Sequence, residues 1–230
     1  MLFRTLLPAL AFVLVLTGCG VGTTDEAAVA DDAATSTETD IAETDIAVAG
    51  DLDPIAVPMS LYIMTEGGDP TSPLSSTRTV DEVTEIADRV SDLWAPAGIV
   101  FDPVRVIEIE APTDVLGPIA LGLDTGPFLD QAGRTFDVPD TGAVNGFFVS
   151  QAAGVNGFAP LNSRIFFVVD QPSVHDERVT SHEIGHLFGL HHVLDDPERL
   201  LFSGTNGIDL TEVEIDVARY TAQGILDGAR

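Results

Sequence analysis

Apolar residues recur at short, regular intervals between positions 55 and 230, and this pattern predicts a folded domain. Short apolar runs of the kind that form buried strands lie at residues 59–64, 143–150 and 164–170. Residues 99–101 and 104–109 predict either a pair of strands or one interrupted strand. The chain therefore contains enough strand pattern for a sheet.

Three helices are predicted from apolar residues at helical spacing, over residues 79–94, over residues 173–189 and from about residue 211 onward. End signals support each of them. Thr79 is the first residue of the first helix, and Ser173 is the expected N-cap of the second. Gly189 suits the exit from the second helix, and Thr211-x-x-Glu214 has the form of a capping box.

Two stretches between these elements lack a clear pattern. Residues 112–139 are rich in Gly and Pro, and residues 154–162 are expected to be a loop. The alternation of strands and helices favours an α/β (α+β) domain with a mixed, twisted sheet. The domain is expected to span residues 55–230.

The first 19 residues have the pattern of an export signal rather than of a folded element. Arg4 precedes an apolar run at residues 6–16, which Pro8 interrupts and which is short for a membrane span. The run ends in Leu16-Thr17-Gly18-Cys19, which resembles a bacterial lipobox. This resemblance implies lipidation of Cys19 and an exported protein that is lipid-anchored to the bacterial cell envelope. An ordinary signal peptide containing a Cys and an uncleaved anchor are the alternatives.

Residues 20–54 contain ten acidic residues, no basic residue and no aromatic residue. Such a segment cannot bury enough apolar area to offset the entropy lost on ordering. We expect a disordered acidic linker, with a short latency peptide as the alternative.

The charge of the chain restricts its partners. It has 37 acidic residues against 10 basic ones, for a formal net charge of −27. Nucleic acids and anionic membrane surfaces are bound by clustered positive charge, so neither is an expected partner. A single Cys excludes an intramolecular disulfide and a thiolate zinc cluster. We expect a monomer.

A histidine motif supplies the candidate chemistry. His182 and His186 are four residues apart and project from one side of the second predicted helix, a spacing that allows both imidazoles to bind one zinc ion. Gly189 lets the chain turn so that His192 returns as a third ligand. Three protein ligands leave one coordination position open, which is typical of catalytic zinc sites. Glu183 is placed beside the ligands as a general base.

This segment resembles the metzincins, a clan of zinc endopeptidases with the pattern H-E-x-x-H-x-x-G-x-x-H, which the chain matches at all five fixed positions. The resemblance implies one catalytic Zn²⁺ and a protein or peptide substrate. It also implies a mixed sheet with an active-site helix and a C-terminal helix. Substrate of the clan lies extended beside an edge strand, for which residues 143–150 and 154–159 are the candidates.

The chain departs from the clan after the motif. The clan has a methionine-containing turn beneath the zinc, and Phe202 takes that Met-turn position here. His191 is interpreted as a solvated neighbour, with replacement of His192 as ligand left open. Asp195 and Asp196 predict a turn, with contacts to the metal ligands or calcium binding as alternatives. Calcium has no further support in the sequence.

A rival hypothesis from another class is a catalytically inactive, metal-binding surface lipoprotein that acts as a binding module. Phe202 favours it, because the Met-turn is altered. Glu183 argues against it, because zinc binding alone does not require that carboxylate.

Overall fold

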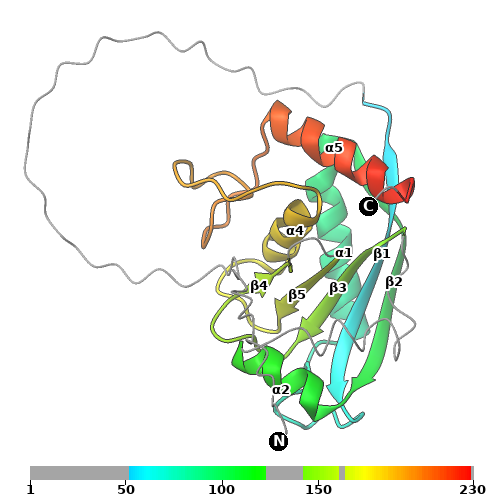
Figure 1. The fold of residues 1–230 in the computed structure, drawn as a ribbon, viewed down its shortest axis with the longest axis vertical. Helices are drawn as coiled ribbons and strands as arrows, with labels where there is room; N and C mark the ends of the chain where they lie inside the picture. Colours follow the sequence, from blue (N-terminus) through cyan, green and yellow to red (C-terminus); the bar gives the residue numbers. More distant parts are fainter. Residues whose placement is uncertain (1–51, 123–141, 161–163, 229–230) are drawn as a thin grey trace, which may run out of the picture.

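The computed structural model describes residues 52–122, 142–160 and 164–228. They form a five-stranded sheet with helices on both faces (Figure 1). The strands, in spatial order, are β2 (Ile99–Ala111), β1 (Ile55–Glu66), β3 (Val144–Val149), β5 (Ile165–Val169) and β4 (Gly157–Phe158). The first four run parallel, and β4 pairs antiparallel with β5. The predicted mixed α/β sheet is confirmed.

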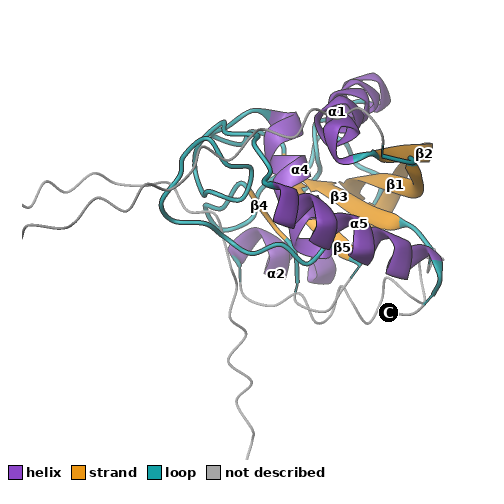
Figure 2. Ribbon diagram, turned by 90° about the horizontal axis from the view of Figure 1, so that it is seen from above, coloured by secondary structure: helices purple, strands orange, loops and turns teal. Residues whose placement is uncertain are grey.

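Helices pack on the two faces of this sheet (Figure 2). They are α1 (Val80–Trp94), α2 (Thr113–Leu121), α4 (Asp176–Leu187) and α5 (Glu212–Leu226). Helices α1, α4 and α5 share one apolar core with alternate residues of β1, including Leu61 and Ile63. The intervening residues Tyr62 and Met64 face a second core with α2. Because successive side chains of a strand point to opposite faces of the sheet, β1 contributes to both apolar cores.

Helix α1 and helix α5 begin where the end signals predict. Thr79 and Thr211 are the N-caps, and each forms a complete capping box with the glutamate three residues later. Residues 99–101 and 104–109 belong to one strand, β2, whose pairing with β1 is irregular between Val57 and Met59.

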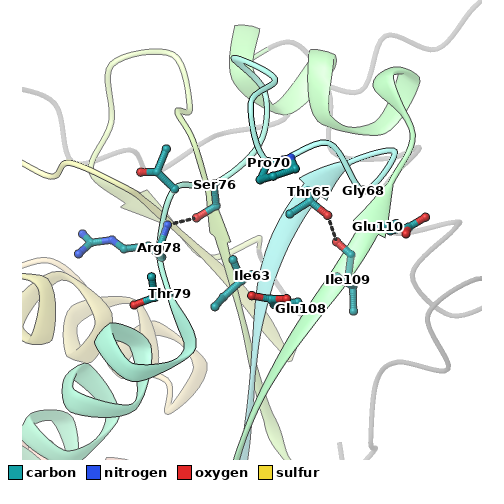
Figure 3. Close-up of a pocket in the computed structure, with 11 residues that line it drawn as sticks. Ile63, Thr65, Gly68, Pro70, Ser76, Arg78, Thr79, Glu108, Ile109 and Glu110 are labelled. Atoms are coloured by element: carbon teal, nitrogen blue, oxygen red, sulfur yellow. Dashed lines mark hydrogen bonds between the residues drawn. The ribbon is translucent and has the colours of Figure 1, made fainter.

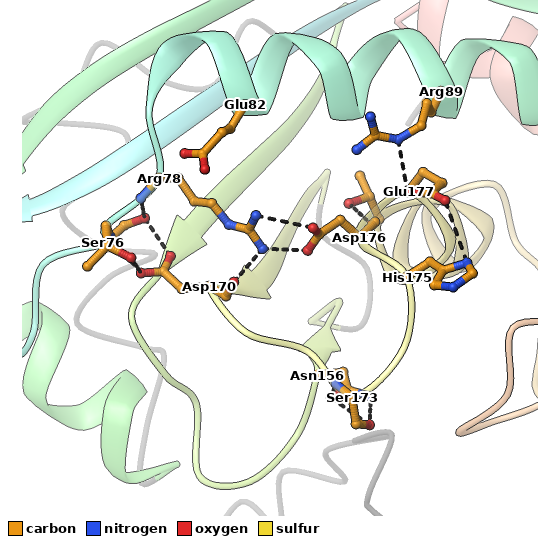
Figure 4. Close-up of polar contacts among 12 residues, drawn as sticks. Ser76, Arg78, Glu82, Arg89, Asn156, Asp170, Ser173, His175, Asp176 and Glu177 are labelled. Atoms are coloured by element: carbon orange, nitrogen blue, oxygen red, sulfur yellow. Dashed lines mark hydrogen bonds and ion pairs between the residues drawn. The ribbon is translucent and has the colours of Figure 1, made fainter.

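The predicted start of the second helix is wrong. Helix α4 begins at Asp176, and its N-cap is His175, which makes no capping bond through its side chain. Ser173 instead bonds the Asn156 side chain, through its backbone N–H at 2.8 Å and its hydroxyl (Figure 4). Arg78 pairs with Asp176 and donates to the Asp170 carbonyl. These long-range contacts fix the start of α4 in place of the local cap.

Two elements lie in the stretches that lack a clear sequence pattern. Helix α2 occupies the first part of the Gly- and Pro-rich stretch at residues 112–139, and β4 lies inside the expected loop at residues 154–162. Residues 123–139 of that stretch lie outside the described residues. So do the predicted signal peptide with Cys19 and the expected linker up to residue 51. In the described part of the chain, no helix is long and apolar enough to cross a membrane.

Arg219 joins the first described residues to the last helix. From α5 its guanidinium donates to the Asp53 carbonyl at 2.8 Å and to the carbonyls of Ala97 and Gly98 at 3.0 and 3.1 Å. The start of β1 is therefore held against α5, and Figure 1 shows the C-terminal end of the domain beside it.

Candidate metal centre

Three imidazoles converge where α4 ends. His182 and His186 lie on one side of α4, and His192 follows in the loop after it. The Nε2 atom of His192 lies 3.1 Å from that of His182 and 3.2 Å from that of His186. Gly189 makes the return possible, because its φ of 84° is in the left-handed region that glycine occupies without strain. The three nitrogens thus surround one small volume.

Two of the imidazoles are oriented by backbone carbonyls. His182 Nδ1 lies 2.7 Å from the Leu200 carbonyl oxygen, and His186 Nδ1 lies 3.0 Å from that of Leu190. A carbonyl only accepts, so each Nδ1 carries the proton and each Nε2 presents a lone pair. This is the arrangement in which metal-binding histidines are held in proteins.

Burial keeps these imidazoles neutral. It lowers the pKa of His182 to about 3, with the neighbouring His186 adding to the effect. Burial also lowers the pKa of His186 and of His192. Neutral imidazole is the form that binds a metal, so the three side chains are ready for a cation near neutral pH.

Glu183, which follows His182 on α4, is a buried carboxylate. It is completely buried, and neither of its oxygens has a hydrogen-bond partner within the described ranges. Burial raises its pKa well above the ordinary value, and the charge of Arg178 opposes that shift. An ionised carboxylate in such a place needs a positive partner, and a cation held by the three imidazoles would supply one. The donor set therefore fits a zinc ion.

The segment after the motif lies against α4. Leu201 is fully buried, and a Cβ built at Gly185 would lie 3.1 Å from its Cδ2 atom. Phe202 is half-buried and forms a backbone bridge with Val193. The side chain that packs on α4 between the histidines is thus that of Leu201, and Phe202 lies one residue further along.

We expect Phe202→Met to leave zinc binding intact, because Phe202 is only half-buried and both side chains offer apolar packing. Leu201→Ala is the matched comparison. It removes a fully buried side chain and should cost about 2–5 kcal/mol of unfolding free energy. Zinc content is measured for both variants, and chemical denaturation gives their free energies of unfolding. Loss of zinc in Phe202→Met would show that its ring, and not Leu201, supports the ligands.

The remaining sequence candidates fall outside the cluster. His191 is exposed. Asp196 accepts a hydrogen bond from the Glu198 N–H at 3.0 Å, which is the expected turn. Within the described ranges, Asp195 and Asp196 do not belong to a group that could hold a metal ion.

One candidate for the substrate-binding edge is wrong. Strand β3, within the proposed segment 143–150, pairs with β1 on one side and β5 on the other, so its backbone has no free edge. The other candidate, residues 154–159, contains β4, which is an outer strand of the sheet. A Cβ built at Gly157 in β4 would lie 3.0 Å from Glu183 Oε1. This edge therefore runs directly past the carboxylate.

A separate pocket of about 590 Å³ lies near the carboxyl ends of β1 and β2 (Figure 3). Thr65, Arg78 and Glu108 are among its lining residues, and no residue of the histidine motif is. Its wall is hydrogen-bonded internally, for example from Thr65 Oγ1 to the Ile109 carbonyl at 3.2 Å. It is thus distinct from the metal centre.

Sequence reasoning missed three groups at the site. They are the carbonyls of Leu200 and Leu190, which no side-chain pattern reveals, and Arg178. The sequence does contain an indication of Arg178, because it lies four residues before His182 and is the one arginine in the helix predicted over residues 173–189.

Fold and site together define a mixed α/β domain that carries a three-imidazole cluster on a helix covering the sheet. Solved structures share this fold. A crystal structure of archaemetzincin from Methanopyrus kandleri matches with a TM-score of 0.50 and 14% identity, over 73% of this chain and 96% of that chain. Metalloproteinase-II from Bacteroides fragilis matches with a TM-score of 0.51 and 14% identity, over 73% of this chain.

This chain covers 53% of the Bacteroides fragilis protein. No family model matches the chain, and no curated protein sequence matches it. At such identities the likeness establishes the fold alone.

Proposed function

We propose that this protein is a zinc-dependent endopeptidase of the metzincin type, with His182, His186 and His192 as metal ligands and Glu183 as the general base. The observation that carries the proposal is the site itself. Three Nε2 atoms converge, and the residue that follows His182 is a fully buried carboxylate without a hydrogen-bond partner among the described residues. The fold shared with archaemetzincin and metalloproteinase-II supports it.

A zinc ion at this site would act as a Lewis acid and lower the pKa of a bound water to about 7. The chain itself supplies the proton transfers. Glu183 takes the proton of the attacking water and later delivers it to the leaving amine, so that one residue serves as base and then as acid. Its burial keeps bulk water from competing for the proton.

Strand β4 offers the backbone edge for a peptide substrate. It is an outer strand, and its Gly157 lies against Glu183. An extended peptide that adds to this edge gains main-chain hydrogen bonds and passes the carboxylate at a fixed distance. A Cβ at position 157 would lie 2.8 Å from the Phe167 carbonyl oxygen and 3.0 Å from Glu183, so glycine lets β4 approach both.

The experiment is to measure zinc content and casein or peptide hydrolysis of the purified protein, before and after removal of metal with a chelator. We expect about one zinc per chain, loss of hydrolysis on chelation and recovery when zinc is restored. Zinc binding without hydrolysis of any peptide would favour the inactive, metal-binding surface lipoprotein. Absence of zinc binding would refute both hypotheses.

We also propose that the protein is exported and anchored to the bacterial cell envelope by lipid on Cys19. The support is the sequence Leu16-Thr17-Gly18-Cys19 at the end of an apolar run, and Cys19 is the single cysteine of the chain. An acidic linker that repels itself would hold the domain away from the membrane.

Cys19→Ser is expected to release the protein from membranes or to block processing of its signal, because serine cannot form the thioether. Membrane fractionation and labelling with a fatty-acid probe measure this in a bacterial host. A variant that stays membrane-bound with the mobility and label of the parent would contradict lipidation at Cys19.

A further inference from the structure

A buried arginine lies beneath the metal centre. Arg178 is 1% exposed and precedes His182 by four residues, so the two side chains leave α4 on the same side. Its guanidinium donates to the Leu200 carbonyl at 2.9 Å, to the Phe202 carbonyl and to the Gly207 carbonyl at 3.4 Å. One side chain thus holds three backbone groups of the segment at residues 200–207.

The Leu200 carbonyl is shared between this arginine and the metal centre. Its oxygen also accepts the Nδ1–H of His182, at 2.7 Å. A carbonyl has two lone pairs and serves both donors. The position of this oxygen decides whether Nδ1 of His182 carries the proton and hence whether Nε2 is available for a metal.

Packing alone does not explain a charged residue here. Taking a guanidinium out of water is expensive, and replacing buried charges by apolar residues of similar volume is often neutral or stabilising. The planar donor fork of arginine, however, binds several carbonyls at once with fixed geometry. The loop it holds has little regular structure, with backbone bridges from Val193 to Phe202 and from Arg199 to Asp209.

We infer that Arg178 is a positioning residue of the metal centre: it fixes the Leu200 carbonyl, which fixes the tautomer and orientation of His182. The inference rests on the proposed function, because orienting His182 matters through the metal that it binds. Removing such a supporting group typically weakens metal affinity by about 10–100-fold.

The test uses the purified full chain with Arg178→Met, Arg178→Lys and Ile86→Ala. Methionine keeps apolar bulk and removes all donors. Lysine keeps the charge but cannot hold three carbonyls in the same geometry. Ile86→Ala is the matched control, because it removes a buried side chain of α1, on another element of the same core. Two quantities are measured: the zinc Kd by competition with a chelator, and the ring ¹⁵N shifts of His182 in the zinc-free protein.

We expect Arg178→Met to raise the zinc Kd by about 10–100-fold and to populate the Nε2–H tautomer of His182. Arg178→Lys should fall between it and the parent. Ile86→Ala should lower the melting temperature and leave both quantities unchanged. If Arg178→Met lowers the melting temperature but keeps the zinc Kd and the His182 ¹⁵N shifts of the parent, the arginine only stabilises the fold and the inference is overturned.

If Arg178→Met does not fold, Arg178→Lys decides: an unchanged Kd and unchanged His182 shifts overturn the inference, and a weaker Kd with altered shifts supports it. If the parent binds no zinc, the proposed function fails, and the zinc-free ¹⁵N shifts still show whether Arg178 sets the tautomer of His182.

Discussion

Glu183→Ala is expected to keep zinc bound and to lower peptide hydrolysis by about 10²–10⁴-fold, the usual contribution of a positioned proton-transfer group. The three imidazoles are untouched, so metal content should stay near one per chain. Folding should not suffer either. The variant removes a fully buried carboxylate without a hydrogen-bond partner in the described part of the chain, and such a group costs stability unless a charge compensates it.

Steady-state kinetics, metal analysis and thermal unfolding of the same preparation measure this. Glu177→Ala is the control, because Glu177 lies on the same helix and pairs with Arg89 at its surface. It should hydrolyse peptides like the parent. Equal rates in Glu183→Ala and the parent would refute the assignment of Glu183 as general base.

His186→Ala is expected to lose both zinc and hydrolysis. The remaining His182 and His192 would be two imidazoles in a site open to water, and catalytic zinc sites in proteins use three protein ligands. Because zinc no longer binds, it also no longer stabilises the folded state, so the melting temperature should stop responding to added zinc.

His191→Ala is the matched control for this variant. His191 is exposed and adjacent to His192, and the structure leaves it outside the cluster. Its replacement should change neither zinc content nor rate. A variant His191→Ala that loses zinc, together with His192→Ala that keeps it, would reassign the third ligand.

Features with a local cause could be predicted from the sequence. The capping boxes at Thr79 and Thr211 each lie within four residues, and the spacing of His182 and His186 is set by helix geometry alone. The turn at Gly189 follows from the conformational freedom of glycine. Helices α1 and α5, the body of α4 and the convergence of the imidazoles could therefore be predicted from the sequence.

Features that depend on residues far apart in the sequence could not be predicted from it. Ser173 is a good N-cap residue, but Asn156, 17 residues away, takes its hydrogen bonds. The apolar run of β3 indicates a strand but not that β1 and β5 flank it. Strand β4 is two residues long, too short to show a period. The carbonyl that orients His182 belongs to Leu200, 18 residues further along the chain.

The hydrogen bonds of Arg219 hold the start of the domain against its last helix, and this arrangement suits circular permutation. Asp53 is held to α5 at Arg219, and the helix extends only seven residues beyond it, to Leu226, or about 10 Å. The two ends of the domain therefore lie close enough for a short glycine-rich linker. New ends could open at Pro73, which is exposed in the loop between β1 and α1. Such a circular permutant should still bind zinc, because the metal centre needs the elements in place and not in their present order.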